Sequence, residues 1–72
     1  MSNAPAKKFR IGFLTAAVWK NDGQDRPFYT VDLTRSYKDK DGEYQNGTSL
    51  NHADLLNGAH LLQKANAWIM EQ

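Results

Sequence analysis

Cationic and aromatic side chains cluster at the end of a long alternating segment. Arg35, Tyr37 and Lys38 lie there, and Tyr44 follows beyond a turn. Basic groups attract phosphates and aromatic rings stack on unpaired bases, so this combination suits single-stranded nucleic acid. A plain solvated hairpin would carry the same residues, because acidic side chains at the turn offset the positive charge. Both interpretations remain open at this point.

Residues able to support catalysis or metal binding are sparse. His52 and His60 are eight residues apart and do not form the helical i, i+4 metal pair. Asp32 is an isolated carboxylate that we expect to be hydrogen-bonded to Thr30 or Thr34. The chain has no cysteine, which excludes disulfides and thiolate metal sites. We therefore expect no enzyme activity, no metal and no cofactor.

Strand signals dominate the N-terminal half. Phe9 and Ile11 alternate until Gly12, which predicts either one bent strand or two short strands. The segment 15–20 continues as a strand, and the loop 21–27 ends at Pro27, which indicates a hairpin. We expect Trp19 to pack in the core or an interface, with an exposed role only if it lies on an open sheet face.

The alternation from Phe28 onward is regular. One face is apolar in its first half, and the opposite face is polar, which is typical of a half-exposed antiparallel sheet. The first face carries Tyr29, Val31, Leu33, Arg35 and Tyr37. The Asp41-Gly42 pair predicts a hairpin turn, followed by a weaker strand over residues 43–50.

The pattern then changes to helical spacing, which predicts a helix over about residues 52–70. Asn51 is a favourable N-cap, and Asp54 is placed to favour the helix N-terminus. Gly58 costs such a helix roughly 1 kcal/mol relative to Ala, and we expect it to allow a close packing contact. The fold class is thus α+β, a four-stranded twisted antiparallel sheet followed by one C-terminal helix.

Size and composition predict a small domain that associates with itself. The chain has 72 residues. We expect one domain over residues 9–72, after a flexible arm over residues 1–8. So short a chain is marginally stable alone, and oligomerisation is its remaining ordinary route to stability. We expect a homodimer whose interface includes Leu55, Leu62, Trp68 and Ile69.

Charge and hydropathy narrow the partners. The net charge is +1, with 9 basic and 8 acidic residues, which is not typical of a duplex-DNA binder. The basic residues are concentrated before residue 41, so any cationic surface belongs to the N-terminal half. The sequence has no apolar run long enough to cross a bilayer and no visible export signal, so we expect a cytoplasmic protein without a membrane partner.

Four motifs occur in an order that resembles a known family. They are Phe9-x-Ile11-Gly12, Arg35-Ser36-Tyr37, Asp39-x-Asp41-Gly42-Glu43 and Gly47-Thr48-Ser49-Leu50-Asn51. This order resembles the single-stranded-DNA-binding domain of the transcriptional coactivator positive cofactor four, with small bacterial and phage members and more distant plant Whirly regulators. The resemblance covers residues from about Phe9 to Leu62. It implies a dimer formed largely through the helices, with β-ribbons that bind single strands.

The resemblance also implies residue roles. Tyr37 falls where the family has a tryptophan that contacts nucleic acid, so the resemblance gives it a base-stacking role. Lys20 falls at a basic position of the second strand. The chain departs from the family at Thr34, where the coactivator has an arginine, and at Arg35, where it has an acid. The loop 21–26 is longer and more acidic, which puts contacts at the ribbon tip in doubt.

Two hypotheses follow. The first is a homodimeric protein that binds single-stranded DNA or RNA with little sequence preference, as an accessory factor in transcription or replication. Its predicted contact residues are Arg10, Lys20, Arg35, Tyr37 and Lys38. The second is a non-catalytic protein-interaction module that kept the fold but not nucleic-acid binding. The near-neutral charge and the acidic loop support the second hypothesis.

Overall fold

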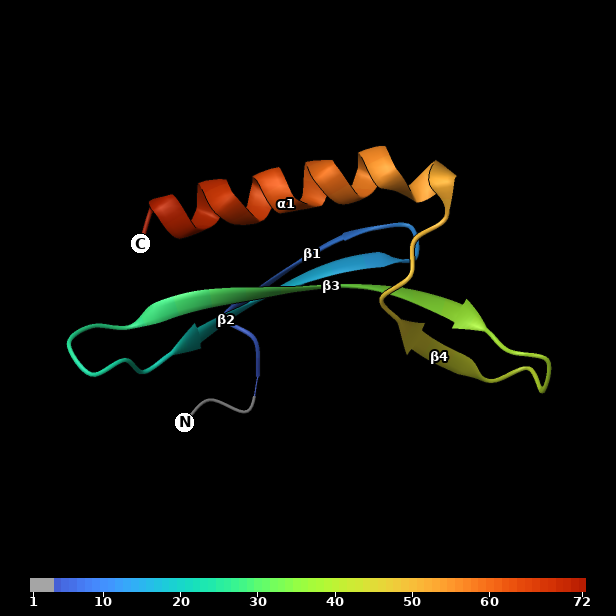
Figure 1. The fold of residues 1–72 in the computed structure, drawn as a ribbon, viewed down its shortest axis with the longest axis horizontal. Helices are drawn as coiled ribbons and strands as arrows, with labels where there is room; N and C mark the ends of the chain where they lie inside the picture. The colour runs from blue at the N-terminus through green and yellow to red at the C-terminus, as the bar shows by residue number, and fades with distance from the viewer. Residues whose placement is uncertain (1–3) are drawn as a thin grey trace.

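The chain folds into an antiparallel sheet with one helix packed across it, as Figure 1 shows. The computed structural model describes residues 4–72. The strands follow each other in the sheet in chain order. The elements are β1 (Lys7–Ile11), β2 (Leu14–Asn21), β3 (Phe28–Lys38), β4 (Tyr44–Gly47), a 3-10 turn η1 (His52–Asp54) and the helix α1 (Leu55–Met70). The expected α+β fold class is confirmed.

Strand β2 holds the centre of the core. Its alternate residues Leu14, Ala16 and Val18 are buried beneath the helix. In the register with β3, Leu33 pairs with Ala16 and Val31 with Val18. The apolar half of β3 therefore faces the helix, as its alternation predicted. No helix or strand among residues 4–72 covers the opposite face of the sheet (Figure 1), and we call it the open face.

The first two strands agree with one expectation and correct another. Gly12 adopts φ 58° and forms a tight turn with Phe13, so the N-terminal segment is two short strands, one of the two alternatives that the sequence left open. Lys7 and Lys8, expected in a flexible arm, belong to β1, where they pair with Val18 and Ala17. The rest of that arm is only partly described, since residues 1–3 lie outside the described range.

The last strand and the helix also begin and end differently. Strand β4 stops at Gly47 instead of reaching Leu50, because Leu50 packs against the core cluster around Leu14 and Leu61. The expected helix begins with a 3-10 turn after Asn51, and its α-helical part starts at Leu55. The Asp54 carboxylate accepts a hydrogen bond from the Asn51 N–H at 3.0 Å, so the predicted capping residues do act at this helix start.

Helix α1 packs on the sheet along one of its faces. Gly58, Leu61 and Ala65 are its buried positions, spaced three and four residues apart as one helix face requires. A Cβ atom on Gly58 would lie 3.3 Å from Leu50 Cδ1, so glycine is what allows this close approach. Further along, Trp68 packs edge-on against Tyr29, with ring centroids 5.9 Å apart.

A second side of α1 is apolar but exposed. Leu55 and Leu62 are 51 % and 45 % exposed, and Leu56 and Met70 are more exposed still. We call Leu55, Ala59, Leu62 and Met70 the helix stripe, because their spacing places them on one side of α1. Of the four predicted interface residues, Leu55 and Leu62 lie in this stripe. Trp68 and Ile69 are half-buried, and Trp68 contacts Tyr29 of its own chain.

Candidate nucleic-acid interface

The end of β3 borders a hollow of about 340 Å³. It forms because β3 continues past the β1–β2 turn, where the Ser36 N–H donates to the Phe13 carbonyl at 2.9 Å. Tyr37 and Lys38 point to opposite sides of β3, so the hollow wraps around the edge of the strand. We call it the basic–aromatic hollow; its lining residues are Phe13, Arg35, Ser36, Tyr37, Lys38 and Tyr44.

Each cation of the hollow lies near an aromatic ring. The Arg35 guanidinium carbon is 5.9 Å from the centre of the Tyr37 ring, and the Lys38 Nζ atom is 5.8 Å from that of Tyr44. These are cation–π distances. Tyr37 is 40 % and Tyr44 67 % exposed, so both rings keep surface on which a base could stack.

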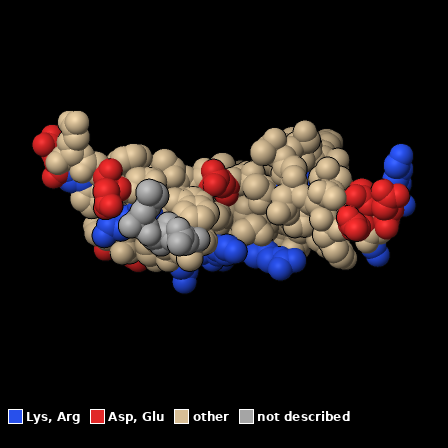
Figure 2. Space-filling model, turned by 90° about the horizontal axis from the view of Figure 1, so that it is seen from below, with Lys and Arg blue, Asp and Glu red and all other residues tan. Residues whose placement is uncertain are grey.

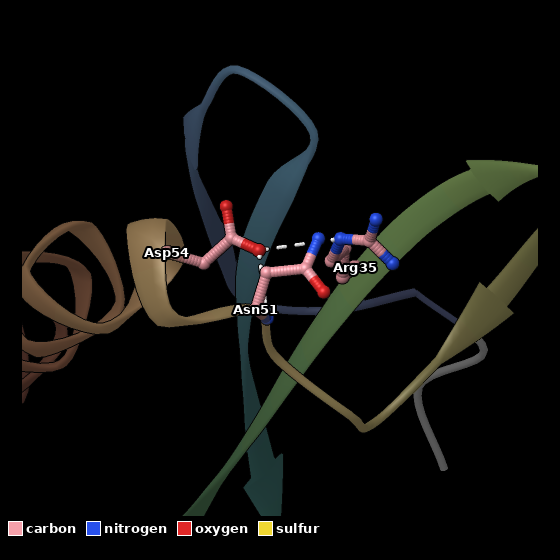
Figure 3. A network of polar contacts seen from close by, with 3 residues as sticks. All are labelled: Arg35, Asn51 and Asp54. Atoms are coloured by element: carbon pink, nitrogen blue, oxygen red, sulfur yellow. Dashed lines mark hydrogen bonds and ion pairs between the residues drawn. The ribbon is translucent and has the colours of Figure 1, made fainter.

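Arg35 also joins the sheet to the start of the helix (Figure 3). Its Nε atom lies 3.3 Å from Asp54 Oδ2, the same oxygen that accepts the Asn51 N–H. Part of the Arg35 charge is therefore neutralised within the chain. A phosphate would meet a weaker field here than an unpaired arginine would supply.

The turn beyond Lys38 is organised by a carboxylate. Asp39 Oδ1 accepts the backbone N–H groups of Asp41 and Glu43 at 2.9 and 3.0 Å, and Oδ2 accepts from Gln45 Nε2 at 3.1 Å. The hydrogen bond from the Glu43 N–H, followed by that from Gln45, holds the pKa of Asp39 below its usual value. Asp39 thus stabilises the hairpin turn, and its carboxylate is not a free group that would repel a phosphate.

The predicted contact residues do not all come together. Arg35, Tyr37 and Lys38 share the hollow. Arg10 lies on the edge strand β1, where its Nε donates to the Gly12 carbonyl at 2.9 Å. Lys20 pairs with Tyr29, six residues from Arg35 along β3 and thus about 20 Å away. Within one chain, these two residues are separate from the hollow.

A second hollow lies on the open face and was not predicted. It measures about 370 Å³, and we call it the open-face trough; its lining residues are Lys8, Thr15, Ala17, Trp19, Asp32, Thr34, Ser36 and Asn46. The polar side of β3 was visible in the sequence. The small residues Thr15 and Ala17 of β2 could be placed beside it only from the register of the strands. Trp19 lies on the open face. We expected an exposed role for this residue only in that position.

Asp32 does not have the expected threonine partners. In the part of the chain that the structure describes, no hydrogen bond reaches its carboxylate, and Thr30 Oγ1 accepts from Asn21 Nδ2 at 3.1 Å instead. Asp32 is exposed and lines the trough.

Charges of both signs are distributed over the open face, which Figure 2 shows from below the sheet. Basic side chains gather along one long edge, and acidic side chains lie at both ends, beside further basic ones, and near the middle of the face. On one chain, therefore, this view shows no continuous positive channel. Any electrostatic attraction of a phosphate backbone would act along the edge rather than over the whole face.

Among residues 4–72, no three His, Cys, Asp or Glu side chains cluster in a way that could hold a metal ion. His52 and His60 are both exposed. The same residues include no helix with the length and apolar character needed to cross a membrane.

Comparisons of the chain with protein-family models, curated proteins and solved structures found no match.

Proposed function

We propose that this protein binds single-stranded nucleic acid, DNA in the first place, at the basic–aromatic hollow. The observation that carries the proposal is the convergence of Arg35, Lys38, Tyr37 and Tyr44 on one hollow. Cations beside exposed aromatic rings are what a flexible single strand needs, since its phosphates and its bases are both accessible. A duplex hides its bases and would use only the cations.

The expected mode of binding is weak per chain. Arg35 is partly neutralised by Asp54, and the net charge is only +1. Affinity would come from two phosphate contacts and one or two stacked bases, repeated on a second copy. We therefore propose a homodimer, which presents two hollows to one strand and raises the apparent affinity through linkage of the sites. A role as an accessory factor in transcription or replication would suit such binding.

The test is fluorescence anisotropy with labelled oligo-dT over a salt series. Binding should strengthen as salt is lowered and should exceed binding to a duplex of equal length. Tyr37→Ala should weaken binding roughly 5- to 150-fold, the range for the loss of one stacked base. Lys38→Gln should lower the slope of log affinity against log salt by about 0.7, the value for one phosphate contact with a single strand.

Tyr37→Phe is the matched control, because it keeps the ring and removes only the hydroxyl. It should bind nearly as well as the parent chain. If oligo-dT does not bind at low salt, or if Tyr37→Ala binds as tightly as Tyr37→Phe, the proposed site is wrong.

A protein-interaction module is the second candidate. The mixed charges of the open face (Figure 2) and the exposed helix stripe favour it. It predicts that no oligonucleotide binds in a salt-dependent way. It also predicts that a pull-down with this protein retains a protein partner, and that the partner is lost when Trp19 on the open face is substituted.

A further inference from the structure

The open-face trough has a low floor between a cation and an acid. In the sheet register, Lys8 pairs with Ala17, and Ala17 pairs with Asp32. The three residues therefore form one row across β1, β2 and β3, and the small Ala17 side chain leaves space between the other two. Two strand spacings separate Lys8 from Asp32, about 10 Å between backbones.

Asp32 determines what can occupy this trough. Among the described residues that line it, Asp32 is the one acid and Lys8 the one cation. An ionised carboxylate accepts hydrogen bonds and cannot donate them, and it repels phosphate. A nucleotide in the trough would thus place its phosphate toward Lys8 and the N–H donors of its base toward Asp32.

We propose that the trough binds a guanine base of the single strand. The guanine N1–H and N2–H groups would donate hydrogen bonds to the two oxygens of Asp32. This inference rests on the proposed single-strand binding and adds a base preference to it. Guanine is the base whose pairing edge offers two adjacent N–H donors to a carboxylate. Thymine offers one such ring N–H, and cytosine and adenine offer only an exocyclic amine.

Two further features suit this ligand. Trp19 lines the trough, and its Nε1 atom is buried without a hydrogen-bond partner in the described chain. The part of the indole that faces the trough is consequently apolar, as base stacking requires. Ser36 lines both the trough and the basic–aromatic hollow, so one strand could pass from one to the other.

The experiment compares oligo-dT strands that differ at one central position. That position is dT, dA, dG or deoxyinosine, which lacks the N2 amine of guanine. A single dG avoids four-stranded guanine structures. We expect the dG strand to bind about tenfold more tightly than the dT strand, within the range for a bidentate base contact. The deoxyinosine strand should lose most of that gain.

Asp32→Asn should abolish the dG preference and leave oligo-dT binding unchanged or slightly tighter, because a negative charge is lost. Asp25→Asn is the matched control, since it makes the same change outside the trough and should keep the preference. Equal binding of all four strands, with oligo-dT still bound, would overturn the guanine site alone. A dG preference that survives in Asp32→Asn would also overturn it.

Loss of oligo-dT binding separates the two proposals. If only the dG strand binds, the trough stands and the basic–aromatic hollow does not. If no strand binds, both proposals are overturned.

Discussion

Asp39 fixes the shape of the hairpin that carries Lys38 and Tyr44. Its carboxylate accepts from two backbone N–H groups and one amide side chain across the turn. These bonds favour the ionised form, which is why its pKa is lowered. The orientation of one cation and one ring of the hollow is therefore linked to the charge state of a neighbouring acid.

Acid should loosen this hairpin. The pKa of Asp39 is lower in the folded chain than its unfolded value of about 3.9. Its stabilising contribution is thus fully present above that value and is lost as the pH falls through the folded pKa. Carboxyl chemical shifts measured by NMR should show Asp39 titrating at a lower pH than an unperturbed aspartate.

Asp39→Asn is the control for the hairpin, because it keeps the shape but not the charge. In this variant, acid should change the amide shifts of Asp41 and Glu43 less than it does in the parent chain, because the hydrogen bonds from these amides no longer end on a titrating group. An Asp39 midpoint at or above that of an unperturbed aspartate would contradict the role of these hydrogen bonds.

Arg35 shows which residue properties can be read before the fold is known. Its type and its place near Tyr37 predicted a cation beside an aromatic ring, and the two do lie 5.9 Å apart. Its ion pair with Asp54 was not predictable. That contact depends on where the chain leaves β4 and starts the helix, which is a tertiary property.

At the scale of elements, α1 is fitted to the sheet by a glycine. A Cβ atom at Gly58 would meet Leu50 Cδ1 at 3.3 Å and Leu33 Cδ2 at 3.4 Å. Both are side-chain tips that can yield by a few tenths of an ångström. The helix propensity gained with alanine, about 1 kcal/mol, opposes the cost of that adjustment.

Gly58→Ala should therefore change the free energy of unfolding by less than about 1 kcal/mol, whereas Gly58→Val should lower it by roughly 1–3 kcal/mol through overpacking. Urea denaturation followed by circular dichroism measures both. Ala67→Val, at an exposed position of α1 outside the helix stripe, is the matched control and should cost only a few tenths of a kcal/mol. Equal effects of Gly58→Val and Ala67→Val would mean that the close contact does not form.

Most elements were predictable because their patterns are local. The alternation of Tyr29, Val31 and Leu33 defines β3, and helical spacing defines α1. The end of β4 at Gly47 was not predictable, because Thr48 to Leu50 look equally able to extend a strand. Leu50 is drawn into the core instead, which ends the pairing with β3.

The site was less predictable than the elements, for the same reason. Arg35, Tyr37 and Lys38 are neighbours in sequence and were expected to act together. The trough combines β1, β2, β3 and β4, and its row from Lys8 to Asp32 appears only when three strands are aligned.

As a whole molecule, the chain is extended for its size. Its radius of gyration is 13.8 Å, against about 11 Å for a compact domain of this length. Among the described residues, five apolar side chains are fully buried. A thin sheet under one helix leaves the helix stripe uncovered, and a second copy of the chain is the partner we expect there.

Leu62→Glu should shift the protein toward monomer, because it places a charge in the middle of the helix stripe. Analytical ultracentrifugation at micromolar concentrations measures the association. His60→Glu introduces a similar charge on another side of α1 and should leave association unchanged. A parent chain that sediments as a monomer would rule out the stripe as a dimer interface.

The two tryptophans lie on opposite sides of the sheet. Trp19 lines the open-face trough, and Trp68 packs against Tyr29 beneath the helix. Because the chain has no other tryptophan, its tryptophan fluorescence comes from one emitter on each side. In Trp68→Phe the remaining emission would report ligand entry to the trough, and in Trp19→Phe it would report detachment of the helix. The molecule thus carries separate optical signals for occupancy and for unfolding.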